Sequence, residues 1–428
     1  MVKKILDEVL KHEVYPAMGC TEPVAVAFAA ANSSKLLSGP VTELRIITDS
    51  ATYKNGLAVS IPNTSGRKGN LLAAVLGALI RKPELGSELF KEIGSEIGIA
   101  KKMIEEGKAS IKIDPSRKGI YISAEVFSGK ERALCVLENS HKDIAHLEHD
   151  GKVLISNLSK KSNHVRPYKE WLRNAKFTDL FEAAANATPE QLAYIKKGVE
   201  MNLAASEKGM ALKKVGYYIN DIIEKGFMKK DVFSEAKITA ACATDARMAG
   251  LPVPVMSSGE SGNQGVVAIL VPWIVGKNAS RPEEKILKSI ALSHLVNSYI
   301  KVFTGELAPI CGCAVAAGVG AAAAIVWQFC KGNEHKVSLA VNTIISDIGG
   351  TLCDGAKGGC SLKVASSADS AIRAAYMAIH GEGITEQEGF IGISAEETIQ
   401  NIAQISCAGM NKVDDIILNI MAAKGNLC

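Results

Sequence analysis

The stretch from Leu307 to Cys330 contains no charged residue, and it constrains the fold more than any other segment of the sequence. A stretch of this length must be hidden from water, either in a membrane or inside a protein core. It is rich in Ala and Gly, and two cysteines follow Pro309 near its start. Such weak hydrophobicity, with no second stretch of the kind, is typical of a buried helix. We therefore expect no membrane partner and a core large enough to enclose this helix.

The composition predicts a helical core and no nucleic-acid partner. Hydrophobic residues make up 47% of the chain and aromatic residues only 5%, so Ala, Val, Ile and Leu must build the core. The net charge is +4, and the lysines are scattered among glutamates as on an ordinary solvated surface. The N-terminal segment has the spacing of an amphipathic helix and no secretion signal. We expect a cytoplasmic protein. A homodimer is the candidate assembly, but the sequence does not determine the oligomeric state.

The periodicity of the chain changes twice, which predicts an α+β fold that is predominantly helical. Residues 1–40 and 159–428 carry the helical period and are assigned to a large all-α domain. Residues 41–158 are assigned to a smaller inserted α+β domain with a helical stretch near 70–107. Its expected strands are short and rich in β-branched residues, namely VTELRIIT, GLAVSIP, ASIKID, GIYISAEVF and RALCVLE.

Ten cysteines are distributed along the chain, at positions 20, 135, 242, 311, 313, 330, 353, 360, 407 and 428. In the cytosol these thiols are expected to be reduced. Cys135 and Cys330 lie in apolar runs and are interpreted as small hydrophobic residues. The paired spacing of a structural zinc site and the runs of ferredoxins are both absent from the sequence. Widely separated single cysteines suit a cluster bound where several elements converge.

The segment MGCTEP, from Met18 to Pro23, places a cysteine where a helix is expected to begin. Thr21 suits the N-cap of that helix and Pro23 its first turn. A thiol beside a helix N-terminus has a lowered pKa, so Cys20 is a candidate thiolate. A buried, inert cysteine at a turn is the alternative interpretation.

The segment Pro254–Leu270 interleaves glycines with Ser257, Ser258, Ser261, Asn263 and Gln264 ahead of an apolar helix. Such a loop presents backbone N–H groups and hydroxyls to an anion, most simply a carboxylate. The G-x-x-G-x-x-G spacing is not that of a dinucleotide-binding loop, and the segment lacks the ending of a phosphate loop. A flexible linker is the alternative interpretation.

Two further cysteine segments break ordinary patterning. Cys311 and Cys313 open the most apolar helix of the chain, and Cys353 and Cys360 lie in a glycine-rich loop with Asp354, Lys357 and Lys363. The histidines are interpreted differently. His141, His146 and His149 lie in a polar stretch and are expected in a solvated turn, while His294 is expected to be an ordinary histidine within a helix.

Four segments together resemble the L-cysteine desulfidase family, which is related to the iron–sulfur L-serine dehydratases. The resemblance covers essentially the whole chain and is carried by MGCTEP at 18–23, SSGESGNQG at 257–265, CGCAVAAGVGAA at 311–322 and CDGAKGGC at 353–360. It implies a four-iron four-sulfur cluster held by three cysteines, with one iron open for the substrate. The ligands that it implies are Cys20, Cys313 and Cys353, with Cys311, Cys360 and the C-terminal Cys428 as alternates.

The reaction implied by this resemblance eliminates sulfide from L-cysteine and leaves pyruvate and ammonia. The open iron would act as a Lewis acid on the leaving sulfur. Ser258, Ser261 and Asn263 are the candidate carboxylate-binding residues, and Asn63 and Thr64 are expected to close the site from the inserted domain. The candidate catalytic residues are Cys20, Glu22 and Lys357, of which Glu22 and Lys357 could serve as the base.

Three other functions remain open at the level of the sequence. The same cluster could act on L-serine, expelling water instead of sulfide. A pyridoxal-phosphate lyase would also eliminate sulfide, but no lysine lies in a recognisable phosphate-binding context and the cysteines would go unexplained. A non-catalytic iron–sulfur sensor would not need the polar glycine-rich loop.

Overall fold

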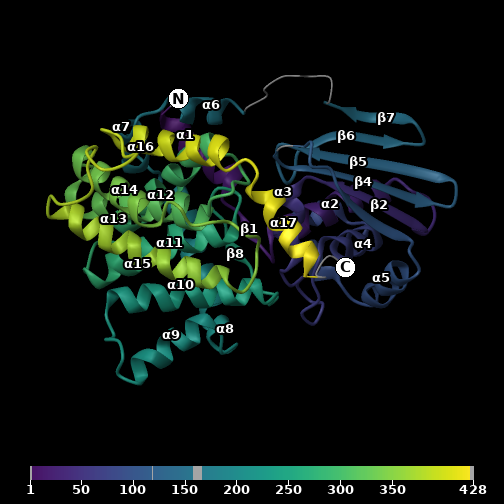
Figure 1. Cartoon of the computed structure of the whole chain (residues 1–428), viewed down its shortest axis with the longest axis horizontal. Helices are drawn as coiled ribbons and strands as arrows, with labels where there is room; N and C mark the ends of the chain where they lie inside the picture. The colour runs from purple at the N-terminus through teal and green to yellow at the C-terminus, as the bar shows by residue number, and fades with distance from the viewer. Residues whose placement is uncertain (1, 118, 158–165, 425–428) are drawn as a thin grey trace.

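The computed structural model describes residues 2–117, 119–157 and 166–424 and has an α+β fold that is predominantly helical, as the sequence predicts. Two hydrophobic cores organise it (Figure 1). The larger core is built mainly by helices, with Val255 and Met256 of a short strand added: α1 (Val2–Glu13), α6 (Pro167–Asn174), α7 (Phe177–Ala185), α8 (Pro189–Met210), α10 (Val232–Met248), α11 (Gly262–Asn278), α12 (Glu283–Thr304), α13 (Gly318–Cys330), α14 (Glu334–Ile348), α15 (Cys360–Ile379) and α16 (Ala395–Gln404). Helix α9 (Val215–Glu224) packs on α10.

The second core lies between a six-stranded mixed sheet and the helices that cover one of its faces. The strand order is β3-β2-β4-β5-β6-β7, with β2 and β3 parallel and the other neighbours antiparallel. The strands are β2 (Glu43–Thr48), β3 (Ala109–Ile113), β4 (Tyr121–Ser128), β5 (Glu131–Glu138), β6 (Ile144–His149) and β7 (Lys152–Ser156). The accompanying helices are α2 (Thr21–Lys35), α3 (Ser50–Leu57), α4 (Asn70–Ile80), α5 (Glu96–Glu105) and the 3₁₀ segment Pro83–Glu92.

Helix α2 packs with the sheet rather than with the larger core. Its Ala-rich buried face contacts α4, β4 and β5, and Ser33 Oγ donates a hydrogen bond to Ala124 O of β4. Small side chains allow this close packing of helix on sheet. The domain division at residue 40 stays a prediction, but it would separate α2 from the core in which α2 lies.

Two connections join the part of the chain around the sheet to the helical part. The short strands β1 (Pro16–Ala17) and β8 (Val255–Met256) pair antiparallel and bring the start of α2 next to the start of α11. The C-terminal helix α17 (Val413–Ala423) leaves the helical part and packs on α3, in the part of the chain around the sheet (Figure 1). Both connections end near the cysteine-containing segments.

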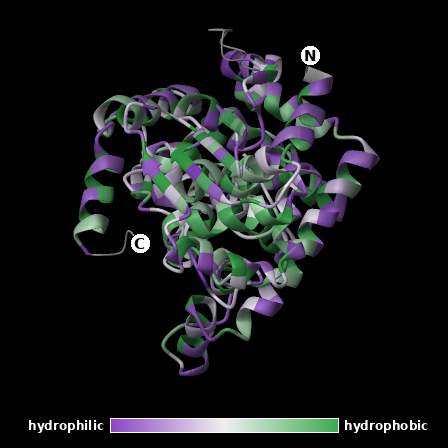
Figure 2. Cartoon of the chain, turned by 90° about the vertical axis from the view of Figure 1, so that its right-hand side faces the viewer, coloured by the Kyte–Doolittle hydropathy of each residue, from purple (hydrophilic) through white to green (hydrophobic). Residues whose placement is uncertain are grey.

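The uncharged stretch forms a core helix, as expected. The segment Cys313–Cys330 is long and apolar enough to cross a membrane, but 83% of it is buried inside the fold. It begins with a π-helical turn, Cys313–Ala317, and continues as α13 against α12, α14 and α15. Figure 2 shows hydrophobic residues gathered on the inner helices and hydrophilic residues on the outer ones.

The structure corrects two local predictions in the inserted part. The segment GLAVSIP does not form a strand, because α3 extends to Leu57 and a tight turn follows it. The stretch with His146 and His149 is not a solvated turn but strand β6, which pairs with β5 and β7. Strand pairing with the sheet edge therefore outweighed the polar composition of that stretch.

Candidate functional site

A single cavity brings together five cysteines from three separate segments of the chain. They are Cys20, Cys311, Cys313, Cys353 and Cys360, and the cavity contains about 900 Å³ of empty space, including the part open to solvent. Cys20 and Cys311 are buried, and the other three are half-buried.

The two central cysteine segments are held side by side by backbone hydrogen bonds. Cys311 N donates to Thr351 O and Cys353 N donates to Pro309 O, both at 2.7 Å. Ile310 and Leu352 thereby form an isolated antiparallel bridge. A hydrogen bond from Cys313 lowers the pKa of the Cys311 thiol. Metal ligation requires thiolates, and only Cys311 of the pair is biased toward one, because the same hydrogen bond and burial raise the pKa of Cys313.

Helix α2 positions Cys20 in a different way from the one that the sequence predicts. The helix begins at Thr21, so Cys20 itself occupies the N-cap position. Its Sγ donates a hydrogen bond to Glu22 Oε2 at 2.7 Å. Burial and the nearby Glu22 carboxylate raise the pKa of Cys20 well above its ordinary value. The expected lowering by the helix N-terminus is therefore wrong for the protein as it stands, because desolvation outweighs the helix dipole.

Glu22 lines the same cavity and is a carboxylate held in place on both oxygens. Asn55 Nδ2 donates to Glu22 Oε1 at 3.0 Å, opposite the hydrogen bond from Cys20. Burial alone would raise the pKa of Glu22, but His141 and these two hydrogen bonds outweigh it and lower the pKa. Glu22 therefore lies beside the cysteines in its ionised form.

Only some of the polar residues predicted to bind a carboxylate in the Pro254–Leu270 segment line the cavity. Ser261, Asn263 and Gln264 line the cavity at the start of α11. Ser258 is buried elsewhere, where its Oγ lies 2.8 Å from both His294 Nδ1 and Asn297 Nδ2. The loop thus presents the helix N-terminus and three polar side chains, an arrangement suited to a carboxylate.

Four of the other predicted residues lie away from the cavity or outside the described residues. Asn63 Nδ2 donates to Phe90 O and so links its turn to the 3₁₀ segment, whereas Thr64 Oγ1 donates to Ile61 O at 2.7 Å within its own turn. Lys357 forms an ion pair with Asp354, and it is Lys363, in the first turn of α15, that lines the cavity. Cys428 lies outside the residues that the structure describes.

His141, which the sequence analysis placed in a solvated turn, is instead a buried residue of the site. It lines the cavity, and neither of its ring nitrogens has a hydrogen-bond partner among the described residues. Burial lowers its pKa, but the carboxylates of Glu260 and Glu22 outweigh this and raise it. The polar sequence around His141 gave no signal of burial, because the residue is enclosed by elements distant in the chain.

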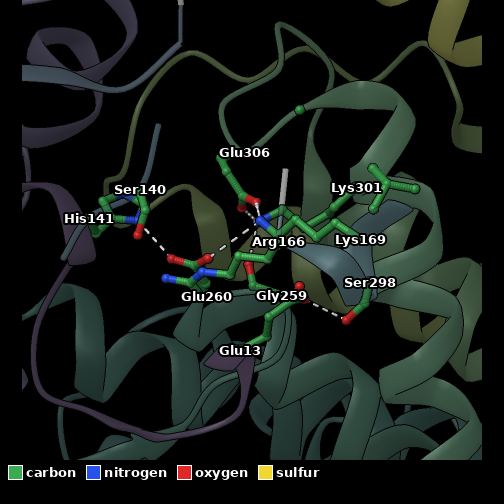
Figure 3. A network of polar contacts seen from close by, with 12 residues as sticks. Glu13, Ser140, His141, Arg166, Lys169, Gly259, Glu260, Ser298, Lys301 and Glu306 are labelled. Carbon is green, nitrogen blue, oxygen red and sulfur yellow. Dashed lines mark hydrogen bonds and ion pairs between the residues drawn. The ribbon is translucent and has the colours of Figure 1, made fainter. Parts of the chain in front are cut away.

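A network of buried charges forms the wall of the cavity next to His141 (Figure 3). Glu260 lies 3.7 Å from both His141 Nδ1 and Lys169 Nζ. Glu306 pairs with Lys169 and Lys301, and although burial opposes it, these cations lower the pKa of Glu306 to about 2. Glu260 adopts a left-handed φ of 59°, a conformation that is uncommon for a non-glycine residue. The network places fixed charge of both signs beside the cysteines.

The donor set fits an iron–sulfur cluster. Five thiols from separate elements face one cavity, in the pattern expected for a cluster bound at the convergence of segments. Three could ligate three irons, and the polar loop and His141 are available on the same cavity for a substrate. The π-helical turn that starts at Cys313 is a feature found often at functional sites.

Comparison with known proteins places these residues in a family context. The family model for the serine dehydratase alpha chain matches residues 94–419. A UPF0597 protein of Elusimicrobium minutum is 56% identical over 421 residues, which cover 98% of this chain and 99% of the relative. A second, from Geobacter sulfurreducens, is 52% identical over 98% of both chains. No solved structure matches this chain.

These matches extend over the segments that carry Cys311, Cys313, Cys353 and Cys360 and over the polar loop before α11. The chain therefore belongs to the serine dehydratase alpha chain family, a family of lyase-type enzymes associated with iron–sulfur clusters.

Proposed function

We propose that this protein is a lyase that eliminates the β-substituent of a small L-amino acid, with L-cysteine as the substrate. The products would be hydrogen sulfide, pyruvate and ammonia. The observation that carries this proposal is the convergence of five cysteines and a carboxylate-binding loop on one cavity. Family membership supports lyase chemistry, and the sequence resemblance supports L-cysteine.

The proposed cofactor is a four-iron four-sulfur cluster held by Cys20, Cys313 and Cys353. Cys311 and Cys360 line the same cavity and are the alternate ligands. When bound, the cluster would supply an open iron that acts as a Lewis acid on the leaving sulfur. Cys428 is a further alternate ligand that only the family resemblance supports.

The residues of the chain would orient the substrate and accept its proton. Ser261, Asn263 and Gln264 would bind the substrate carboxylate at the start of α11. The α-proton would pass to a base, the bond between Cβ and sulfur would break, and sulfur would leave with the electron pair. The aminoacrylate that remains would take up water and give pyruvate and ammonia.

His141 is the residue that we propose as the proton acceptor, in place of Lys357. Its imidazole lines the cavity, and its Nδ1 has only a 3.7 Å contact with Glu260, whereas the Lys357 ammonium is paired with Asp354 and does not line the cavity. Glu22 remains the second candidate. His141→Gln should lower kcat by about a hundredfold or more while iron per chain is unchanged, in line with the usual contribution of a general base. Unchanged kcat would assign the proton to Glu22.

L-Serine is the second candidate substrate, and the family match favours it, because the family is described as serine dehydratase. Serine and cysteine differ in one atom, so both would fit the same carboxylate-binding loop. Expulsion of water instead of sulfide would give the same pyruvate and ammonia.

The first test is turnover by protein purified and assayed without oxygen, with iron measured on the same sample. Equal amounts of sulfide and pyruvate from L-cysteine, scaling with iron per chain, are expected. Pyruvate from L-serine at a higher kcat/KM would make serine the substrate. Sulfide release by an iron-free protein would disprove the cluster mechanism.

A further inference from the structure

Arg247, at the end of α10, is a buried cation without a charged partner on the wall of the cavity. Its side chain is only 2% exposed and lines the cavity that holds the cysteines. Nη1 donates a hydrogen bond to Asn263 Oδ1 at 3.0 Å. Nε and Nη2 have no hydrogen-bond partner among the described residues, and no carboxylate of that part of the chain pairs with the guanidinium.

An unpaired guanidinium in this position is energetically costly. Burying a charge requires either an opposite charge or a full set of hydrogen bonds, and Arg247 has one hydrogen bond to a neutral amide. The fork of N–H groups that remains free matches the geometry of a carboxylate. The missing partner is therefore best supplied by an anion that enters the cavity.

The backbone around Arg247 is built to bring this guanidinium next to a helix N-terminus. Gly262 is the first residue of α11, and a Cβ atom there would lie 2.4 Å from Arg247 Nε, so a side chain at this position would displace the guanidinium. The first N–H groups of α11 have no intrahelical partner. Gln264, 7% exposed, also has an unpartnered Oε1 in the same cavity.

We infer that Arg247 binds the α-carboxylate of the substrate through Nε and Nη2, together with the N–H groups at the start of α11. This inference rests on the proposed function, because it takes the substrate to be an α-amino acid. It assigns the recognition of the carboxylate mainly to a residue of α10, with Asn263 holding the guanidinium in place. Amino-acid amides and simple amines should then be excluded.

One other role for Arg247 has to be separated from substrate binding. The guanidinium lowers the pKa of Cys20, although burial and Glu22 outweigh this effect and raise it overall. Arg247 could therefore serve only to stabilise a ligand cysteine. In that case its loss would reduce iron content rather than carboxylate recognition.

The experiment measures binding without turnover on cluster-loaded protein kept free of oxygen. L-Alanine, which cannot undergo the elimination, and L-alaninamide, which lacks the carboxylate, are titrated while the melting temperature is followed. The wild-type protein should be stabilised by L-alanine and not by L-alaninamide. Arg247→Gln should weaken L-alanine binding by about tenfold to a hundredfold, the usual value of a charge-assisted hydrogen-bond pair, at unchanged iron per chain.

Two further variants complete the test. Arg247→Lys keeps the charge but not the fork, so an intermediate loss of L-alanine binding is expected. Arg281→Gln is the matched control, since Arg281 lies over the Phe329 ring and does not line the cavity. Equal stabilisation by the amide, unchanged L-alanine binding in Arg247→Gln, or loss of iron in that variant would each overturn the inference. L-Alanine recognition through Arg247 in a protein without lyase activity would leave this inference standing and reject the proposed reaction.

Discussion

At the scale of single residues, the five cysteines around the cavity differ from the cysteines elsewhere in the chain. Cys135 and Cys242 are fully buried, Cys135 within a hydrophobic core, and Cys407 is exposed on a π-helical turn. The cysteines of the cavity instead sit at helix starts and in turns, where the backbone brings separate segments together. Position in the fold, rather than burial alone, marks a candidate ligand.

The first residue-scale prediction concerns Cys353. Cys353→Ala should remove most of the iron and reduce activity at least a hundredfold, because a three-cysteine site loses one of its ligands. Iron per chain and pyruvate release measure this. Cys407→Ser is the matched control, since Cys407 does not line the cavity, and it should keep both. Full iron content in Cys353→Ala would transfer the ligand role to Cys360.

A second prediction at this scale concerns the pH dependence of stability. Burial lowers the pKa of His294 to about 3. The unfolded chain, with an ordinary histidine pKa, therefore binds a proton that the folded protein does not. The contribution of His294 to stability is complete above about pH 6.5 and is lost progressively as the pH falls toward 3. Between pH 7 and pH 5 the expected loss from this residue is about 2 kcal/mol.

Urea unfolding of the His294→Asn variant at the two pH values tests this expectation. The variant should be less stable at pH 7, because the hydrogen bond to Ser258 is altered, but its stability should fall less between pH 7 and pH 5. His335→Asn, at an exposed position on α14, should keep the pH dependence of the wild type. The same steep loss in His294→Asn would assign the pH dependence to other groups.

At the scale of secondary-structure elements, the start of α11 depends on the absence of side chains. A Cβ atom at Gly265 would lie 1.9 Å from Met256 O and 2.6 Å from Ser257 C, both in the backbone of the preceding segment. Backbone atoms cannot rotate away as a side chain can, so the helix would have to shift as a unit. Such a shift would move Ser261 and Asn263 out of the cavity.

Gly265→Ala should therefore lower stability by about 3 kcal/mol or more, the upper range of overpacking in a core, and weaken amino-acid binding as well. The melting temperature and the L-alanine titration measure both effects. Gly98→Ala in α5 is the control, because nothing lies within 4 Å of a Cβ there. That variant should be unchanged or slightly more stable, as expected for alanine in a helix. Wild-type stability in Gly265→Ala would contradict the close contact.

At the scale of the whole molecule, the cavity lies where the larger core and the part of the chain around the sheet meet. Cys20 comes from α2, which packs on the sheet, and Cys311, Cys313, Cys353 and Cys360 come from the helical part. Lys54 of α3 links the two parts further, because its Nζ donates to Cys353 O and pairs with Asp414 of α17. The site is therefore sensitive to how the two parts are held together.

The prediction at this scale is that Asp414→Asn loosens the C-terminal helix and the Cys353 loop together. Lys54 is only 1% exposed, and losing its carboxylate would leave a buried ammonium with one neutral acceptor, at a cost of about 3 kcal/mol. Hydrogen exchange should increase in α17 and near Cys353, and iron should be lost faster. Asp415→Asn is the matched control, since Asp415 only accepts from the Ser50 hydroxyl. Equal exchange in both variants would show that the ion pair does not hold the loop.

The sequence alone predicted much of the fold and named the cysteines that share the cavity, for identifiable physical reasons. The uncharged Leu307–Cys330 stretch had to be buried, and it forms a core helix. The strands β2, β3, β4 and β5 follow from β-branched alternation, because side-chain period and backbone period agree there. The candidate cysteines stood in segments that broke local patterning, and all those within the described residues line one cavity.

Only the tertiary structure decided which polar residues share that cavity. Ser258, Asn63 and Thr64 looked equivalent to Ser261 and Asn263 in sequence, yet they satisfy hydrogen bonds elsewhere. His141 and Arg247 carry no local signal, because burial and the absence of partners are properties of elements distant in the chain. Local patterning determines helices, strands and turns, whereas the charges that meet around a substrate are set by packing between those elements.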